Sequence, residues 1–425
     1  MKKSAFVCYT ILIVFLSAIY LPQIYRAIFF DNIEKTHLFY SPVIKDFIYK
    51  EKLVGSVPES VKVKAEDHHA RISYQNSNGN YMSRIEFEKL LPFIYYKNLD
   101  IWGLLPLNID GQVYGKDYIK KNRRVFELKS VHINGKSPLT PVWPLLESNP
   151  GQARLVFPDD RFRMTDQAME FINADVNRVD TDLTREFTRA LTDKGFKFPP
   201  RSVNGKFTVL KPFDEGVFLV DHNFQVFHVK RVNNHPQVIK TPIDPSIMTR
   251  HIKISENKAK QYYGLLLDHS GVVYLLSCEN YRLSPLPLGG YDPDTMDLKL
   301  IFNPLYCTAV YSDDIMIHAV AMDRRFVPLA SFSHEMSRGD ITVAKQVYSA
   351  LFPFTLSWNH LNSGFVSLNQ NYSGLTGLVG IVISFVIYLA WMRISGRRKK
   401  FWSVLLVCIT GIYGLVAIQF AGFDE

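Results

Sequence analysis

Residues 216–230, "GVFLVDHNFQVFHVK", alternate apolar and polar side chains on either side of Asp221. Residues 263–277, "YGLLLDHSGVVYLLS", repeat the arrangement, with Asp268 in the place of Asp221 and the same histidine after it. Alternation with a period of two is typical of strands, and an aspartate between two strands can bond its own backbone to close a turn. Each stretch therefore predicts a β-hairpin with the aspartate at its corner.

A third match surrounds Asp323, which lies 55 residues beyond Asp268, as Asp268 lies 47 residues beyond Asp221. Here the histidine is replaced by Arg324, which favours a replaceable turn position over a catalytic Asp-His pair. The spacings are close to the length of a propeller blade, about 40–50 residues. Short alternating runs separated by Asn, Asp, Gly and Pro fill residues 200–370. We predict a mainly β region there, either propeller-like or a β-sandwich.

The preceding residues give a mixed pattern. Residues 23–164 combine a hairpin signal, a short helix and a Pro-rich stretch, and we expect a mixed β and loop part. Residues 165–196 carry apolar side chains at helical spacing, with Thr and Asp where helices start and Gly195 where the second would end. They predict an αα-hairpin inserted in an α+β fold that is predominantly β.

Three apolar runs without a charged residue lie at 5–21, 375–392 and 401–420. Helices of this length cover about 25–30 Å, the thickness of the hydrocarbon core of a bilayer. We predict three transmembrane helices, one N-terminal and two C-terminal. Because Lys2 and Lys3 precede the first run, a signal peptide is the alternative there, but no small-residue cleavage site follows, which favours an anchor.

The charges beside the apolar runs predict an orientation. Lys2 and Lys3 precede the first run, and the loop at 393–400, "RISGRRKK", holds five basic residues. Basic segments beside membrane spans stay in the cytoplasm. The bulk of the chain is then extracytoplasmic, and the lipid bilayer is a partner of the chain.

The net charge of +9 does not indicate nucleic acid as a partner. Seven of the 49 basic residues lie in the predicted cytoplasmic segments and two of the 40 acidic ones at the C-terminus, which leaves 42 basic and 38 acidic residues outside. A nearly balanced surface without a basic stripe does not suit a phosphate backbone.

Catalytic and metal-binding motifs are missing from the sequence. It contains no G-x-S-x-G, H-E-x-x-H, Walker A, G-x-G-x-x-G or C-x-x-C pattern. The acidic stretch "YDPDTMD" at 291–297 lacks the later ligands of a calcium loop, and the adjacent His68 and His69 would point to opposite faces of a strand. We therefore assign no catalytic residue, metal or cofactor.

Two charged clusters remain as binding candidates. One is "FPDDRFR" at 157–163 and the other is "KPFDEG" at 211–216. Each combines carboxylates with basic side chains, so each could be a ligand-binding edge, a pair for acid–base chemistry or a structural ion-pair network. The candidate residues are Asp159, Asp160, Arg161, Arg163, Asp214 and Glu215. Outside the apolar runs, Cys278 and Cys307 could form a disulfide in an oxidising compartment, or remain free thiols.

Several stretches together resemble a family of uncharacterised bacterial membrane proteins of the domain-of-unknown-function type. They are "LPFIYY", "LLESNPG", "FPDDRFR", "GFKFPPR" and "KPFDEGVFLVD" followed by "FHVK". Members of such a family are often encoded beside ABC-transporter components. The resemblance covers most of the chain, including its apolar ends, and it carries no catalytic residues with it. It implies a multi-pass protein of the bacterial inner membrane, with most of the chain in the periplasm and transporter subunits as partners.

Two functions follow as hypotheses. The first is a non-enzymatic, membrane-anchored binding or scaffold protein that serves an ABC-type transport or export complex as an accessory subunit. The second is an extracytoplasmic enzyme that acts on an envelope substrate through the carboxylates at 159–163 or 214–215. Convergence of those carboxylates in one pocket would favour the second.

Overall fold

The computed structural model describes residues 2–30, 36–53, 59, 71–136, 140–339, 342–360, 366–396 and 401–421. The chain forms two compact units. The first contains residues 1–34, 53–57 and 337–425, and the second contains residues 35–52 and 58–336. The second unit holds most of the strands and is called the β unit below. His68, His69 and the terminal acidic residues lie outside the described residues.

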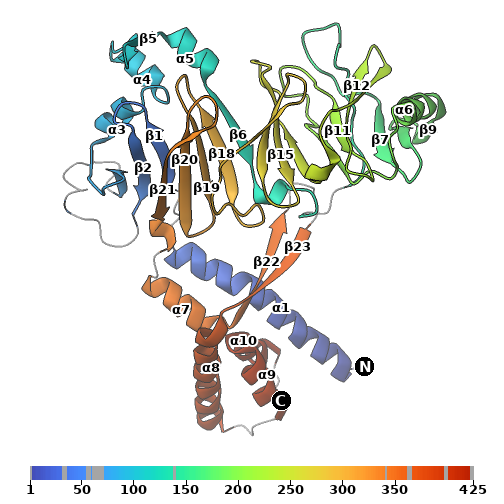
Figure 1. Cartoon of the computed structure of the whole chain (residues 1–425). Coiled ribbons are helices and arrows are strands. Elements are labelled where there is room, and N and C mark those ends of the chain that lie inside the picture. Colours follow the sequence, from blue (N-terminus) through green and yellow to red (C-terminus); the bar gives the residue numbers. More distant parts are fainter. Residues whose placement is uncertain are drawn as a thin grey trace. The chain divides into compact units, whose positions relative to one another are not determined.

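The β unit is built from antiparallel sheets, most of which are meanders of strands adjacent in the chain (Figure 1). The first sheet has three strands, β1 (His37–Ser41), β2 (Asp46–Lys52) and β3 (Ile72–Asn76). A second three-stranded sheet contains β7 (Asp160–Met164), β8 (Met169–Asn173) and β9 (Arg178–Asp180). A small hairpin joins β4 (Leu107–Ile109) and β5 (Gln112–Tyr114).

Three larger sheets follow in chain order. The first comprises β10 (Ser202–Gly205), β11 (Val217–Val220), β12 (Val226–Val232) and β13 (His235–Lys240). The second comprises β14 (Thr249–Ile254), β15 (Tyr262–Asp268), β16 (Val273–Ser277) and β17 (Leu283–Pro285). The third comprises β18 (Asp297–Phe302), β19 (Cys307–Ser312), β20 (Met316–Met322) and β21 (Pro328–Glu335), and β6 (Arg124–Leu128) pairs with β18 as a fifth strand. The predicted mainly β region is confirmed.

The predicted corners at Asp221, Asp268 and Asp323 are confirmed, because each aspartate closes a hairpin in the same way. The Oδ1 of Asp221 accepts the backbone N–H of Asn223 at 2.8 Å and that of Gln225 at 2.9 Å. Asp323 accepts the equivalent pair of amides, and Asp268 accepts the second of them. The residue three positions after each aspartate has a positive φ of 64°, 92° and 66°, respectively. The repeat is therefore one of turn chemistry.

Neighbouring sheets of the β unit pack face to face, and each neighbouring pair has a common hydrophobic core (Figure 1). The β1–β3 sheet packs on the β18–β21 sheet through residues such as Phe47 and Ile317. The other face of the β18–β21 sheet packs on β14–β17, and β14–β17 packs in turn on β10–β13. The β7–β9 sheet and helix α6 (Thr181–Asp193) cover the far face of β10–β13. Five sheets are therefore stacked face to face.

The predicted αα-hairpin at 165–196 is wrong in its first half. Residues 169–173 form β8, which pairs with β7 so that Phe171 lies opposite Phe162, and only α6 is helical. Met169 and Phe171 are buried side chains two residues apart, which is strand periodicity. The apolar residues of this stretch fit either a helix or a strand, and pairing with β7 stabilises the strand.

Short helices complete the β unit. They are α3 (Arg84–Leu90), α4 (Tyr96–Ile101) and α5 (Lys116–Asn122). Helix α3 begins with the capping box that Ser83 and Glu86 predict, since the Ser83 Oγ accepts the Glu86 amide and Glu86 accepts the Ser83 amide.

The other unit contains the apolar helices. It comprises α1 (Lys2–Phe29), α7 (Val343–Leu351), β22 (Phe354–His360), β23 (Val366–Tyr372), α8 (Gly374–Ser395), α9 (Phe401–Thr410) and α10 (Ile412–Ala421). Two stretches, Val7–Phe29 and Gly374–Ser395, are long and apolar enough to cross a membrane. The predicted span at 401–420 is instead two shorter helices separated at Gly411, which has a φ of 58°. Strands β22 and β23, at the end of the predicted region 200–370, belong to this unit.

Candidate functional site

The charged stretch 159–163 forms separate contacts and no common site. Asp160 is buried at the start of β7, and both its carboxylate oxygens accept from the Arg231 guanidinium of β12 at 2.9 Å. Both bonds come from one guanidinium nitrogen, Nη1, and this buried ion pair links two neighbouring sheets. Asp159 is exposed, and Arg163 pairs with Glu170 on β8 at 2.6 Å. The Arg161 guanidinium lies over the Phe157 ring at 5.4 Å.

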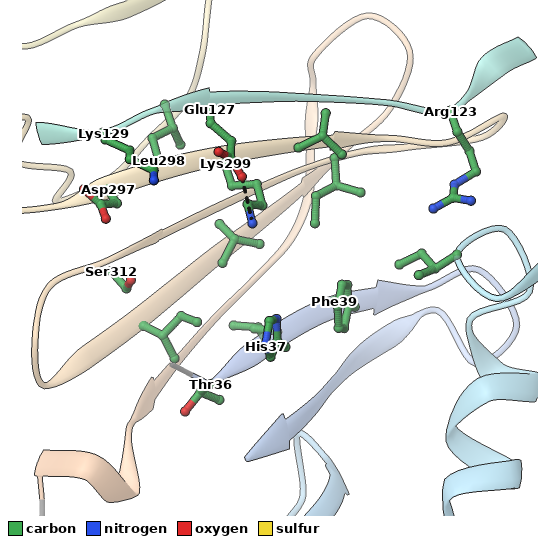
Figure 2. Close-up of a pocket in the computed structure, with 16 residues that line it drawn as sticks. Thr36, His37, Phe39, Arg123, Glu127, Lys129, Asp297, Leu298, Lys299 and Ser312 are labelled. Carbon is green, nitrogen blue, oxygen red and sulfur yellow. Dashed lines mark ion pairs between the residues drawn. The ribbon is translucent and has the colours of Figure 1, made fainter. Parts of the chain in front are cut away.

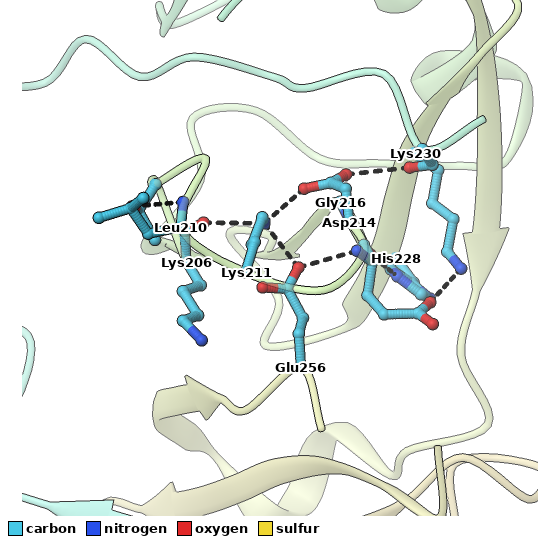
Figure 3. Close-up of polar contacts among 11 residues, drawn as sticks. Lys206, Leu210, Lys211, Asp214, Gly216, His228, Lys230 and Glu256 are labelled. Carbon is cyan, nitrogen blue, oxygen red and sulfur yellow. Dashed lines mark hydrogen bonds and ion pairs between the residues drawn. The ribbon is translucent and has the colours of Figure 1, made fainter. Parts of the chain in front are cut away.

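The second predicted cluster is built around Lys211, whose side chain is 1% exposed (Figure 3). Its ammonium donates to Asp214 at 2.5 Å and to Glu256 at 2.6 Å. The other oxygen of Asp214 accepts from the Gly216 amide at 2.8 Å and from the Ser148 hydroxyl at 2.9 Å. Each charge of Lys211 and Asp214 is thus matched inside the protein, as buried ions require.

Glu215 and His228 extend this network. The Glu215 carboxylate pairs with Lys230, and its backbone carbonyl contacts Nε2 of His228 at 2.5 Å. The Nδ1 of His228 contacts the Tyr281 hydroxyl at 2.9 Å. Burial lowers the pKa of His228 to about 4, and the charge of Lys230 acts in the same direction. His228 is therefore a neutral, fully hydrogen-bonded side chain in the core.

Gly216 explains why the loop can approach β12 so closely. Its φ is 71°, and a Cβ there would lie 2.1 Å from the Val229 carbonyl oxygen. Only glycine fits this position. The loop is thereby fixed against the sheet, and Asp214 and Glu215 are held in ion pairs. Asp160, Asp214 and Glu215 are therefore engaged in two separate ion-pair networks, and Asp159 is exposed.

A groove that the sequence did not indicate lies elsewhere in the β unit (Figure 2). Its volume is about 680 Å³. One wall is the edge strand β1 with the residue before it, and the facing surface is formed by β6, β18 and β19. The three-stranded β1–β3 sheet shares its core with β20 and its neighbours, and this leaves Val125 of β6 48% exposed. The groove follows from stacking a narrow sheet on a wide one.

The groove is lined by apolar side chains and by charges of both signs (Figure 2). Arg123 lies at one end, its guanidinium 5.1 Å from the Tyr96 ring centre. Glu127 and Lys299 form an ion pair of 3.0 Å across β6 and β18. Lys129 and Asp297 lie at the other end, where Asp297 accepts from the Ser130 hydroxyl at 3.2 Å. Apolar patches with charged rims are typical of protein interfaces.

Of the two alternatives for Cys278 and Cys307, a disulfide or free thiols, the structure has free thiols. Burial raises the pKa of Cys278 to about 11 and that of Cys307 to about 12. Both thiols therefore stay protonated at neutral pH. Among the residues that the structure describes, no group of three or more His, Cys, Asp or Glu side chains could hold a metal ion.

The fold and site define a mainly β protein with two helices that are long and apolar enough to cross a membrane. A family model described as "Domain of unknown function (DUF4857)" matches residues 37–322, more than half of the chain. The chain belongs to this family. The match begins after α1 and ends before α7, so it does not include the apolar ends to which the resemblance was expected to extend. A search of curated proteins finds no match.

Proposed function

We propose that this protein is a non-enzymatic binding or scaffold protein anchored in the bacterial inner membrane, with its β unit on the periplasmic side. In this proposal it is an accessory subunit of an ABC-type transport or export complex. The observation that carries the proposal is the groove beside β1, whose apolar lining and charged ends suit a segment of a partner protein.

The apolar helices support the membrane part of the proposal. Helices α1 and α8 would each span the bilayer, and α9 and α10 together would form a third span interrupted at Gly411. The basic residues at 393–400 would then be cytoplasmic. The stack of four-stranded meanders with one turn chemistry supports a propeller-like β unit, in which neighbouring blades pack face to face.

Affinity purification tests the function. The full-length protein, extracted in a mild detergent, should carry transporter subunits with it. Arg123→Glu and His37→Glu, which change charge at the groove, should lose those subunits, whereas Lys240→Glu on the exposed part of β13 should keep them. All variants should unfold at the temperature of the parent protein. Recovery of the protein alone, or subunits retained in both groove variants, would contradict the proposal.

Reporter fusions test the orientation. A periplasm-dependent reporter fused after residue 373 should be active, and the same reporter in the loop at 397–400 should be inactive. The opposite pattern would overturn the proposed topology.

A further inference from the structure

A second cavity, of about 470 Å³, lies where three sheets of the β unit meet at their edges. It is lined by residues 125–127 of β6, residues 205–207 at the end of β10 and residues 253–255 at the end of β14. Each of these strands is the outermost strand of its sheet. Edge strands from three sheets therefore line one concave space, and concave spaces with a few polar groups are where small ligands bind.

Two lysines line this cavity without a carboxylate of their own. In the described part of the chain, neither Lys206 nor Lys253 makes a side-chain ion pair. The acidic residue in the lining is Glu127, and it is bound by Lys299 at 3.0 Å. Figure 3 shows the Lys206 side chain extending away from the Lys211 ion pairs.

The surroundings of Lys253 are positive as well. Burial lowers the pKa of Lys253, and the charges of Lys206 and Lys129 lower it further, against a smaller opposite effect of Glu127. Bringing like charges together in a half-buried place costs free energy unless an anion is present. The lysines are therefore held in an unfavourable arrangement that a negative ligand would relieve.

His251 is a buried neighbour of Lys253 on β14 and does not itself line the cavity. It is two residues earlier on β14, and the two residues pair with Leu267 and Leu265 of β15, which face the β18–β21 sheet. His251 is 7% exposed, and neither ring nitrogen has a hydrogen-bond partner among the described residues. Buried polar groups normally find a partner, so an orphaned imidazole at this place is unusual.

We infer that this cavity binds a small anion carrying phosphate or carboxylate groups, held by Lys206 and Lys253. The ligand neutralises two cations that form no ion pair with a residue of the described chain. This site goes beyond the proposed function, because it takes a small ligand and does not depend on a protein partner at the groove. The two sites share β6, through Val125 and Glu127.

Thermal unfolding of the full-length protein in detergent tests the inference. Inorganic phosphate or citrate should raise the unfolding temperature by about 2 °C or more over sodium chloride at equal ionic strength, because ligands that bind only the folded state stabilise it. Lys206→Gln, Lys253→Gln and the double variant should lose this shift and weaken the calorimetric Kd by about tenfold or more. Lys258→Gln, an exposed lysine in the loop after β14, should behave like the parent protein.

The outcomes separate cleanly. A shift that depends on Lys206 and Lys253 supports the site, and a shift seen only in nanodiscs with phosphatidylglycerol assigns the phosphate to a lipid headgroup. No shift beyond that of sodium chloride with any of these anions, or a shift that survives in the double variant, would overturn the inference. If the double variant does not fold, Lys206→Gln alone decides, since Lys206 is partly exposed and its substitution leaves Lys253 and the mostly buried strand β14 unchanged. Loss of partner proteins with anion binding retained would contradict only the proposed function.

Discussion

Two places in the β unit each contain a lysine and a histidine. They differ in whether those side chains have ion-pair and hydrogen-bond partners within the protein. Lys211 is bound by two carboxylates, and both ring nitrogens of His228 have partners. Lys253 is close to the positive charges of other lysines, and neither ring nitrogen of His251 has a hydrogen-bond partner in the described chain. In the first place the lysine charge and both imidazole nitrogens have partners, and the buried polar atom without one is Oε2 of Glu256; in the second place the lysines form no ion pair within the described chain.

This difference distinguishes charged groups that stabilise the fold from charged groups that are available to a ligand. A buried charge whose partners are all supplied by the chain contributes to the fold and is not available to a ligand. A charge left unmatched reduces stability and is retained where something else supplies the partner. Substitutions should therefore destabilise the protein at the first place and stabilise the empty protein at the second.

The largest effect is expected at Lys211. Lys211→Met leaves Asp214 and Glu256 buried without their common cation, and breaking a buried pair of this kind costs about 3–5 kcal/mol. Denaturant unfolding of the full-length protein in detergent should show this loss. The exposed Lys258→Met should stay within about 0.5 kcal/mol of the parent protein. If the Lys211 variant is as stable as the Lys258 variant, the ion pairs of Lys211 do not stabilise the fold and the contrast between the two places is wrong.

His228 should come next. His228→Leu removes the side-chain partner of the Glu215 carbonyl and leaves the Tyr281 hydroxyl with Tyr263 alone, at a cost of about 1–3 kcal/mol. The matched control is His222→Leu on the same hairpin, because His222 is exposed. Unfolding measured at pH 7.5, well above the lowered pKa of His228, should separate the two variants. Equal stability would show that the hydrogen bonds of His228 contribute nothing.

Mild acid should weaken the protein through both histidines. Burial lowers the pKa of His228 to about 4 and, together with Lys253, His132 and Arg250, that of His251 to about 3. The unfolded chain takes up these protons near pH 6.5, so it binds more protons than the folded chain below that value, and stability falls as the pH drops from 6.5 towards 4. The unfolding temperature at pH 7.5, 6.5 and 5.5 should show this loss.

A control variant isolates the histidines in that profile. The double variant His228→Gln, His251→Leu should lose less stability between pH 7.5 and 5.5 than the parent protein. Parallel curves for the two proteins would assign the acid sensitivity to other groups.

The smallest effect, and one of opposite sign, is expected at His251. His251→Leu replaces two unpartnered polar atoms with an apolar side chain among Leu265 and Leu267, so it should stabilise the empty protein by up to about 1 kcal/mol. Unfolding without added phosphate or carboxylate is the measurement. Destabilisation by more than about 1 kcal/mol would show that the imidazole is needed for packing.

The sequence predicted features that depend on neighbouring residues. The hairpin corners at Asp221, Asp268 and Asp323 are confirmed, because the aspartate bonds amides only two to four residues away. The strand β8 was missed, because its pairing with β7 competes with a weak helical pattern that is equally visible in the sequence. The third apolar run has the composition of a span, but it contains a helix break at Gly411.

The order of residues in the chain by itself determined two features. These are the apolar runs at the ends and, between them, the alternating strands with aspartates at their turns. Both follow from periodicity and local hydrogen bonding. Only the tertiary structure decided which charges are matched, because Lys211 meets Glu256 across 45 residues and Asp160 meets Arg231 across 71. It also decided where the empty spaces lie, since the groove and the cavity of Lys206 and Lys253 arise from sheets of unequal width and from edge strands far apart in the chain.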